Sequence, residues 1–153
     1  MRETFTIPGI ERHEWAVQLP FAFHAPSSYS VQLRRVADAN GCFHLWTIRP
    51  SPYPIPHDGT VGRMLKAQDR HPFRPEHIHF LVEASGHRKL VTHVFAAGDE
   101  YLDSDVVFGV KDSLVREYVR HSGGTTPDGE AMQGEWFSLH YDFSLAADPS
   151  SGR

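Results

Sequence analysis

The chain has 153 residues, which suffices for one sizeable hydrophobic core and, by ordinary domain sizes, favours a single domain. Its formal net charge of -4 and pI near 6.2 argue against nucleic acid or an anionic membrane as partner, because both need a concentrated basic surface. No apolar run approaches the roughly 20 residues that cross a bilayer, and the first residues lack a signal-peptide pattern. We therefore expect a cytoplasmic protein that binds a small molecule.

The predicted secondary structure is almost entirely β. Short runs rich in β-branched and aromatic residues alternate with turn residues, and this pattern predicts an all-β fold, specifically a β-sandwich. A first hairpin is predicted to join residues 31–37 to residues 42–48 through the turn Asn40-Gly41, because Asn-Gly favours positive φ. A second hairpin is predicted to join residues 77–84 to residues 89–96.

The segments around the second hairpin are predicted to contain long loops. Residues 49–76 are rich in proline, which fixes φ and removes backbone donors, so we expect a loop with at most a short helix at residues 61–68. A further loop is expected at residues 98–104. Helix and strand are both compatible with residues 114–120, and we favour a strand there.

The last part of the chain is predicted to form one more strand. Residues 121–129 are rich in glycine, threonine and proline, which is typical of a turn. Phe137, Leu139, Tyr141 and Phe143 then alternate as in a strand. We expect one domain over residues 1–146 and a disordered tail over residues 147–153.

The content of cysteine and histidine restricts the type of metal site. Cys42 is the only cysteine, so the chain has no internal disulfide and no paired thiolate site, and any metal must be held by nitrogen and oxygen. Eleven histidines invite a metal hypothesis, but most histidines in such a chain are surface polar groups. Their spacing has to show which of them share one site.

His77 and His79 have the spacing of a two-ligand site on a strand. Alternation places both imidazoles on one face and leaves Ile78 and Phe80 on an apolar opposite face. The two positions are roughly 7 Å apart along the strand, and their rings can converge on one ion. Taken alone, the pattern more often marks a polar face of a sheet.

Tyr53 strengthens the metal hypothesis. Pro52 and Pro54 stiffen the loop around its phenol, and rigid loops suit functional side chains. Taken alone, a tyrosine flanked by prolines more often packs on a loop. Together with His77 and His79, however, a phenolate oxygen gives a ligand set that suits ferric iron better than zinc or calcium.

Two long motifs resemble the intradiol ring-cleavage dioxygenases. They are residues 53–59, Tyr-Pro-Ile-Pro-His-Asp-Gly, and residues 70–80, Arg-His-Pro-Phe-Arg-Pro-Glu-His-Ile-His-Phe. Residues 101–110 and 141–143 are similar to the hydroxyquinol 1,2-dioxygenases within that family, and the likeness covers roughly residues 31–145. Family members usually carry a helical N-terminal region for dimerisation, for which this chain has no room, and a homodimer is left open.

This resemblance implies a cofactor, a ligand set and a reaction. The cofactor would be non-haem Fe(III), held by Tyr53, His77 and His79, with Tyr29 as the candidate for a further tyrosine ligand. The reaction would cleave a catecholic diol or triol with O2. Hydroxyquinol (benzene-1,2,4-triol) would give a maleylacetate-type product, and catechol would give cis,cis-muconate.

The resemblance also implies three catalytic roles. Tyr53 would leave the metal when the substrate binds. Arg74 would stabilise negative charge that develops on the ring, and His93 would donate a hydrogen bond near the metal or to the substrate. His57, His71 and His87 are expected to make loop or solvent hydrogen bonds instead.

Two other readings are compatible with the same residues. One is a truncated, weak or inactive homologue that keeps a metal- or ligand-binding sandwich, which the short N-terminal part favours. The other is a different β-fold metalloenzyme that uses His-x-His, such as a cupin-like or zinc hydrolytic site. Visible colour distinguishes a tyrosinate–iron centre from a zinc site, because tyrosinate bound to ferric iron absorbs visible light and zinc does not.

Overall fold

The computed structural model of the chain describes residues 2–6, 37–127 and 129–149. Within these ranges the protein is built mainly of strands, as the sequence predicts. The strands are β1 Arg2–Thr6, β2 Cys42–Trp46, β3 Tyr53–Pro54, β4 Phe73–Arg74, β5 His77–Val82, β6 Leu90–Ala96, β7 Val115–Arg116, β8 Val119–Thr125 and β9 Ala131–Asp142. The helical segments are α1 Thr60–Ala67 and the 3-10 turns η1 Leu102–Ser104 and η2 Asp112–Leu114.

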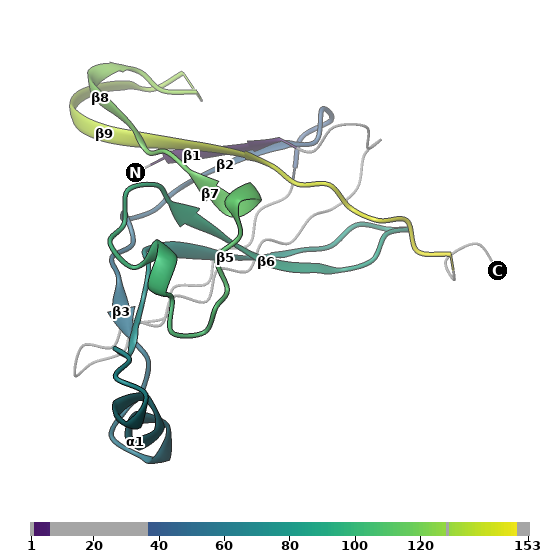
Figure 1. Cartoon of the computed structure of the whole chain (residues 1–153). Helices are drawn as coiled ribbons and strands as arrows, with labels where there is room; N and C mark the ends of the chain where they lie inside the picture. Colours follow the sequence, from purple (N-terminus) through teal and green to yellow (C-terminus); the bar gives the residue numbers. More distant parts are fainter. Residues whose placement is uncertain (1, 7–36, 128, 150–153) are drawn as a thin grey trace.

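Two larger sheets form the two layers of the fold. One has the strand order β2-β1-β9-β8, with β1 antiparallel to β2 and parallel to β9. The other has the order β5-β6-β7, with β5 antiparallel to β6 and β6 parallel to β7. Figure 1 shows the first sheet above β5 and β6, with α1 at the end of the molecule away from β8 and β9.

The hydrophobic core lies between these two sheets. Its buried members come from β2, β5, β6 and β9 and from the residue that follows β9: Phe43, Leu45, Ile78, Phe80, Val82, Val94, Leu139 and Phe143. The apolar face predicted for β5 is therefore the core face, since Ile78, Phe80 and Val82 are almost completely buried. The predicted β-sandwich is confirmed.

The predicted second hairpin is present as β5 and β6. Gly86 takes a positive φ of 73° in its turn, a conformation that glycine adopts without strain. In the first predicted hairpin, the turn forms as expected, with Gly41 at φ 76° and the Asp38 carboxylate accepting from the backbone N–H groups of Asn40 and Cys42. Residues 31–36 lie outside the described residues. Among those that are described, β2 pairs with β1.

The proline-rich segment contains the predicted helix and also two short strands. Helix α1 ends in a Schellman motif: Asp69 has φ 51°, its N–H donates to the Lys66 carbonyl, and the N–H of Arg70 donates to the Leu65 carbonyl. The expectation of loop elsewhere was wrong at β3 and β4, where Tyr53 pairs with Arg74. These pairs join residues about 20 apart, which local sequence patterns do not reveal.

For the last third of the chain the structure confirms one expectation and corrects another. A strand at residues 114–120 was expected, and β7 and the start of β8 lie there. The turn predicted for residues 121–129 was wrong over its first half, because β8 continues to Thr125 and absorbs its glycines in an irregularity between Ser122 and Gly124.

The beginning of the predicted disordered tail makes backbone hydrogen bonds. Ala147 pairs with His87, and the N–H of Asp148 donates to the Gly86 carbonyl at 2.8 Å. These contacts tie residues 147 and 148 to the turn between β5 and β6, contrary to the expectation of disorder from residue 147 onward. The domain limits themselves stay a prediction. Among the described residues, no helix is long and apolar enough to cross a membrane.

Candidate metal centre

The β5–β6 hairpin gathers three histidines on one face. In its antiparallel register His79 lies opposite His93 and His77 lies opposite Phe95. Side chains that are directly opposite point to the same face of a sheet, so His77, His79 and His93 share one face. The pair Ile78 and Val94 points to the other face and is fully buried in the core.

The phenol of Tyr53 approaches the same point from another part of the chain. Because β3 pairs with β4, Tyr53 lies beside Arg74 and close to the start of β5. Its hydroxyl oxygen is 3.4 Å from Nε2 of His77, which in turn is 3.1 Å from Nε2 of His79. The three donor atoms that were predicted from the sequence therefore converge.

The hydrogen bonds of His77 place its lone pair on Nε2, which faces the cluster. Its Nδ1–H donates to the carbonyl of Pro75 at 2.6 Å, which makes Nε2 the unprotonated nitrogen. Arg74 donates from Nη1 to that Nε2 at 3.1 Å. Backbone acceptors of this kind fix the ring orientation of metal-binding histidines.

Burial keeps the three imidazoles neutral. It lowers the pKa of His77 to about 3 and that of His79 to about 4, and nearby Arg74 lowers both further. Burial also lowers the pKa of His93, with Arg74 adding to the effect. A neutral imidazole is the form that binds a metal, so the ring nitrogens are available near neutral pH.

A buried ion pair holds Arg74 at the centre. Its Nε lies 3.2 Å from Oδ1 of Asp105, and its Nη2 lies 3.4 Å from Oδ2. Arg74 and Asp105 are both buried. The ring of Phe95, fully buried on the same face as His77, forms an apolar floor for the group.

The donor set fits a transition-metal ion. Ligand atoms of His77, His79 and His93 all lie within 4.8 Å of one another, and in the described part of the chain this is the one such group of histidine, cysteine or carboxylate side chains. Imidazole nitrogens suit iron, zinc, copper and nickel, and a phenolate oxygen adds a hard, charged donor that suits ferric iron. The residues present therefore fit the implied iron.

The remaining candidates from the sequence have different outcomes. Tyr29 lies outside the described residues, so its role as a ligand stays a prediction. His57 and His87 each bond a nearby backbone carbonyl through Nδ1, and His71 bonds Ser104 through Nε2, as expected for loop histidines.

His93 lies in the same cluster as His77 and His79. The ring centroids of His79 and His93 are 4.2 Å apart. The sequence did not fix this placement, because strands at residues 77–84 and 89–96 would put residue 93 opposite residue 80, whereas the structure pairs His79 with His93.

Glu76 turns away from the centre. Its carboxylate pairs with Arg49 at 2.6 Å, and its backbone N–H donates to Asp99 at 2.8 Å. Burial raises the pKa of Glu76, although the hydrogen bond from Arg49 acts to lower it. This acidic residue therefore supplies no ligand to the histidine cluster.

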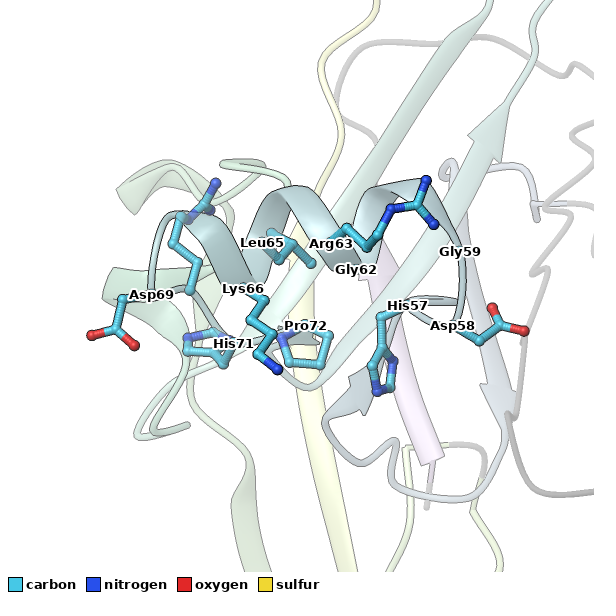
Figure 2. Close-up of a pocket in the computed structure, with 11 residues that line it drawn as sticks. His57, Asp58, Gly59, Gly62, Arg63, Leu65, Lys66, Asp69, His71 and Pro72 are labelled. Carbon is cyan, nitrogen blue, oxygen red and sulfur yellow. The ribbon is translucent and has the colours of Figure 1, made fainter.

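A separate hollow of about 660 Å³ lies beside α1, and no residue of the histidine cluster lines it. Figure 2 shows the side chains of His57 and Lys66 on the same side of α1 as His71 and Pro72. The hollow is open and carries charges of both signs, including Asp58. The hollow is therefore not part of the candidate metal centre.

Comparison with known proteins identifies the family. The dioxygenase family model Dioxygenase_C matches residues 19–147. Hydroxyquinol 1,2-dioxygenase of Nocardioides simplex is 54% identical over 108 residues, which cover 70% of this chain and 37% of that protein. The intradiol ring-cleavage dioxygenase of Aspergillus niger is 45% identical over 115 residues, covering 73% of this chain and 34% of that protein. This chain belongs to the intradiol dioxygenase family.

The structure agrees with this intradiol dioxygenase assignment. The crystal structure of hydroxyquinol 1,2-dioxygenase from Pseudomonas putida DLL-E4 superposes with a TM-score of 0.83 and 35% sequence identity, covering 96% of this chain and 56% of that one. The chain therefore spans little more than half of that structure and 37% and 34% of the two curated relatives.

Proposed function

We propose that this chain forms the metal- and substrate-binding core of an intradiol dioxygenase, with Fe(III) held by Tyr53, His77 and His79 and with Tyr29 as a further ligand. Its substrate is hydroxyquinol or catechol, and O2 cleaves the ring between the two carbons that carry adjacent hydroxyl groups. The observation that carries the proposal is the convergence of the Tyr53 hydroxyl and the two imidazoles on one point.

Three properties of the protein suit this reaction. Bound Fe(III) would supply a Lewis acid that attracts both oxygens of the diol and favours their ionised form. The phenolate oxygen of Tyr53 can accept a proton from a substrate hydroxyl. The neutral state of His77 and His79 leaves their nitrogens free for ligation at the pH of the cell.

Arg74 and Phe95 prepare the space where the substrate binds. Arg74 carries a fixed positive charge beside His77, held by Asp105, and this charge stabilises negative charge on the aromatic ring during attack by oxygen. Phe95 excludes water below the cluster, which strengthens that electrostatic effect. His93, on the opposite strand, lies where it can donate a hydrogen bond near the metal or to a substrate oxygen.

Visible absorption of the Fe(III)-loaded protein tests the proposal. We expect a broad charge-transfer band, because a tyrosinate bound to ferric iron absorbs visible light. Tyr53→Phe keeps the ring and removes one of the two proposed phenolate donors, so the band should weaken and shift, and Tyr29 should supply what remains. Tyr141→Phe is the matched control, because Tyr141 lies in β9 of the other sheet and its loss of a hydroxyl should leave the band unchanged.

Oxygen consumption then separates an enzyme from an inactive homologue. The coloured protein should consume O2 when hydroxyquinol or catechol is added, with one ring cleaved for each O2. A coloured protein that consumes no O2 with either substrate would favour the inactive homologue. A colourless protein with full iron occupancy would contradict the proposed tyrosine ligation.

A further inference from the structure

His93 lies closer to His79 than His77 does, and only slightly farther from His77. The ring centroids of His77 and His79 are 4.8 Å apart, and His93 is 4.2 Å from His79 and 5.4 Å from His77. The hairpin register fixes this arrangement, since opposite side chains in an antiparallel pair have Cβ atoms about 4.5–5.5 Å apart. His93 therefore occupies a place from which it can reach the same ion.

The hydrogen bonds around His93 leave its ring available. His77 uses Nδ1 on the Pro75 carbonyl, whereas no described residue forms a hydrogen bond with either ring nitrogen of His93. The ring is half-buried, and aromatic side chains surround it on the cluster side. The ring nitrogens of His93 are therefore available to an ion that binds at His77 and His79.

Arg74 can remain in place when an ion enters. Only its Nη1 reaches Nε2 of His77, while Nε and Nη2 are held by the two carboxylate oxygens of Asp105. A metal that takes the Nε2 lone pair therefore displaces one hydrogen bond and leaves the buried ion pair intact. The positive charge beside the ion is balanced in part by Asp105.

We propose that His93 is itself a protein ligand of the centre. His77, His79 and His93 then form a face of three imidazoles, which binds a divalent ion such as Co²⁺ or Zn²⁺ even without the Tyr53 oxygen. Three imidazoles are a common ligand set for zinc and for other first-row divalent ions. The inference concerns the same centre as the proposed function and rests on it for the position of the ion, but it does not require Fe(III) or ring cleavage.

Binding of Co²⁺ alone tests this assignment in the full-length chain. Paramagnetic Co²⁺ shifts the ring N–H protons of its histidine ligands far outside the normal proton range, so these signals count the bound imidazoles. We expect three shifted ring N–H signals in the wild type and two in His93→Ala. The Co²⁺ dissociation constant of that variant should rise by about 100-fold or more, beyond the 10–100-fold typical for losing a residue that only supports a ligand.

His93→Gln distinguishes a ligand from a hydrogen-bond donor. Glutamine keeps a polar group of similar reach but offers no imidazole nitrogen, so it should behave like His93→Ala if His93 binds the ion. His87→Ala is the matched control, because His87 is a histidine in the turn of the same hairpin and its ring bonds the Ser85 carbonyl. It should retain three signals and the wild-type affinity. Unfolding curves of the metal-free variants establish that each one folds.

The outcomes separate this inference from the proposed function. Two shifted signals in the wild type, or unchanged Co²⁺ affinity in His93→Ala and His93→Gln, would overturn the assignment of His93. The charge-transfer band of the Fe(III) protein would still support the proposed function in that case. Conversely, three signals with Co²⁺ and no visible band with Fe(III) would keep His93 as a ligand and reject the tyrosinate–iron centre.

Discussion

The carboxylate of Asp105 holds Arg74 beside the histidine cluster. Besides its two contacts with Arg74, it accepts from the backbone N–H of Gly109 at 2.8 Å and from that of Val107 at 3.4 Å. Burial acts to raise the pKa of Asp105, but the hydrogen bonds from Arg74 and Gly109 lower it below its usual value. The side chain is thus a charged anchor for Arg74 at neutral pH.

Replacing Asp105 by Asn should destabilise the protein in a pH-dependent way. At pH 7 we expect the free energy of unfolding to fall by about 3–5 kcal/mol, because buried Arg74 loses its partner. Since the folded pKa of Asp105 is lowered, its contribution is complete above the unfolded value of about 3.9 and is lost as the pH falls through the folded value. Urea unfolding at neutral and acid pH measures both effects.

The exposed carboxylate of Asp103 provides the control for this prediction. Asp103 lies two residues before Asp105, in η1, and is exposed to solvent. Asp103→Asn should change the free energy of unfolding by less than about 0.5 kcal/mol at either pH. If the difference between wild type and Asp105→Asn persists unchanged at acid pH, ionisation of Asp105 is not its source.

Single residues of the centre differ in how far the sequence could locate them. His77 and His79 could be predicted because two alternate positions on one strand share a face. Tyr53 could be predicted because of its flanking prolines and its motif. The role of Asp105 could not be predicted, because its partner Arg74 lies 31 residues away and a single aspartate in a loop does not indicate a partner. The position of His93 opposite His79 could not be predicted, because the predicted strand limits would have placed residue 93 opposite residue 80, on the other face.

Helix α1 is the element whose position depends most clearly on one glycine. A Cβ atom on Gly62 would overlap the carbonyl oxygen of His57, so the helix lies directly against the loop that precedes it. The sequence predicted a helix near these residues from their local pattern. It could not predict the close approach, which depends on two backbone segments meeting in space, nor could it predict β3 and β4, which pair across α1.

Gly62→Ala should destabilise the protein, although glycine to alanine normally stabilises a helix. The normal gain is about 0.5–1 kcal/mol, whereas forcing an atom into a filled space typically costs about 1–3 kcal/mol. We expect the overlap with His57 to dominate, giving a net loss in the free energy of unfolding. Denaturant unfolding at equilibrium measures the sign.

Gly134→Ala is the matched control for the helix substitution. Gly134 lies in β9, and a Cβ added there meets no atom within 4 Å. Alanine should be neutral or slightly stabilising at this position, because it reduces the freedom of the unfolded chain. A stabilised Gly62→Ala variant would show that the loop at His57 moves aside at little cost.

Strand β5 connects the centre with the stability of the whole molecule. Its alternate residues face the core between the sheets, where Phe80 packs against Phe143 with ring centroids 4.9 Å apart. The alternate positions on its opposite face are occupied by His77 and His79. The period of two in residues 77–84 allowed this division to be predicted, but the parallel pairs β1–β9 and β6–β7 join segments too distant for any local pattern to indicate.

Metal binding should therefore stabilise the entire sandwich against unfolding. An ion that binds only the native arrangement of His77, His79 and Tyr53 raises the free energy of unfolding by RT ln(1 + [L]/Kd), where [L] is the free ion concentration and Kd its dissociation constant. The gain is about 2.7 kcal/mol when [L] is 100 times Kd. Urea unfolding of the wild type with and without Co²⁺ measures this gain, and His79→Ala should lose most of it. His57→Ala removes a loop histidine from outside the cluster and should keep the full gain. An equal gain in His79→Ala would mean that Co²⁺ stabilises the protein from another site.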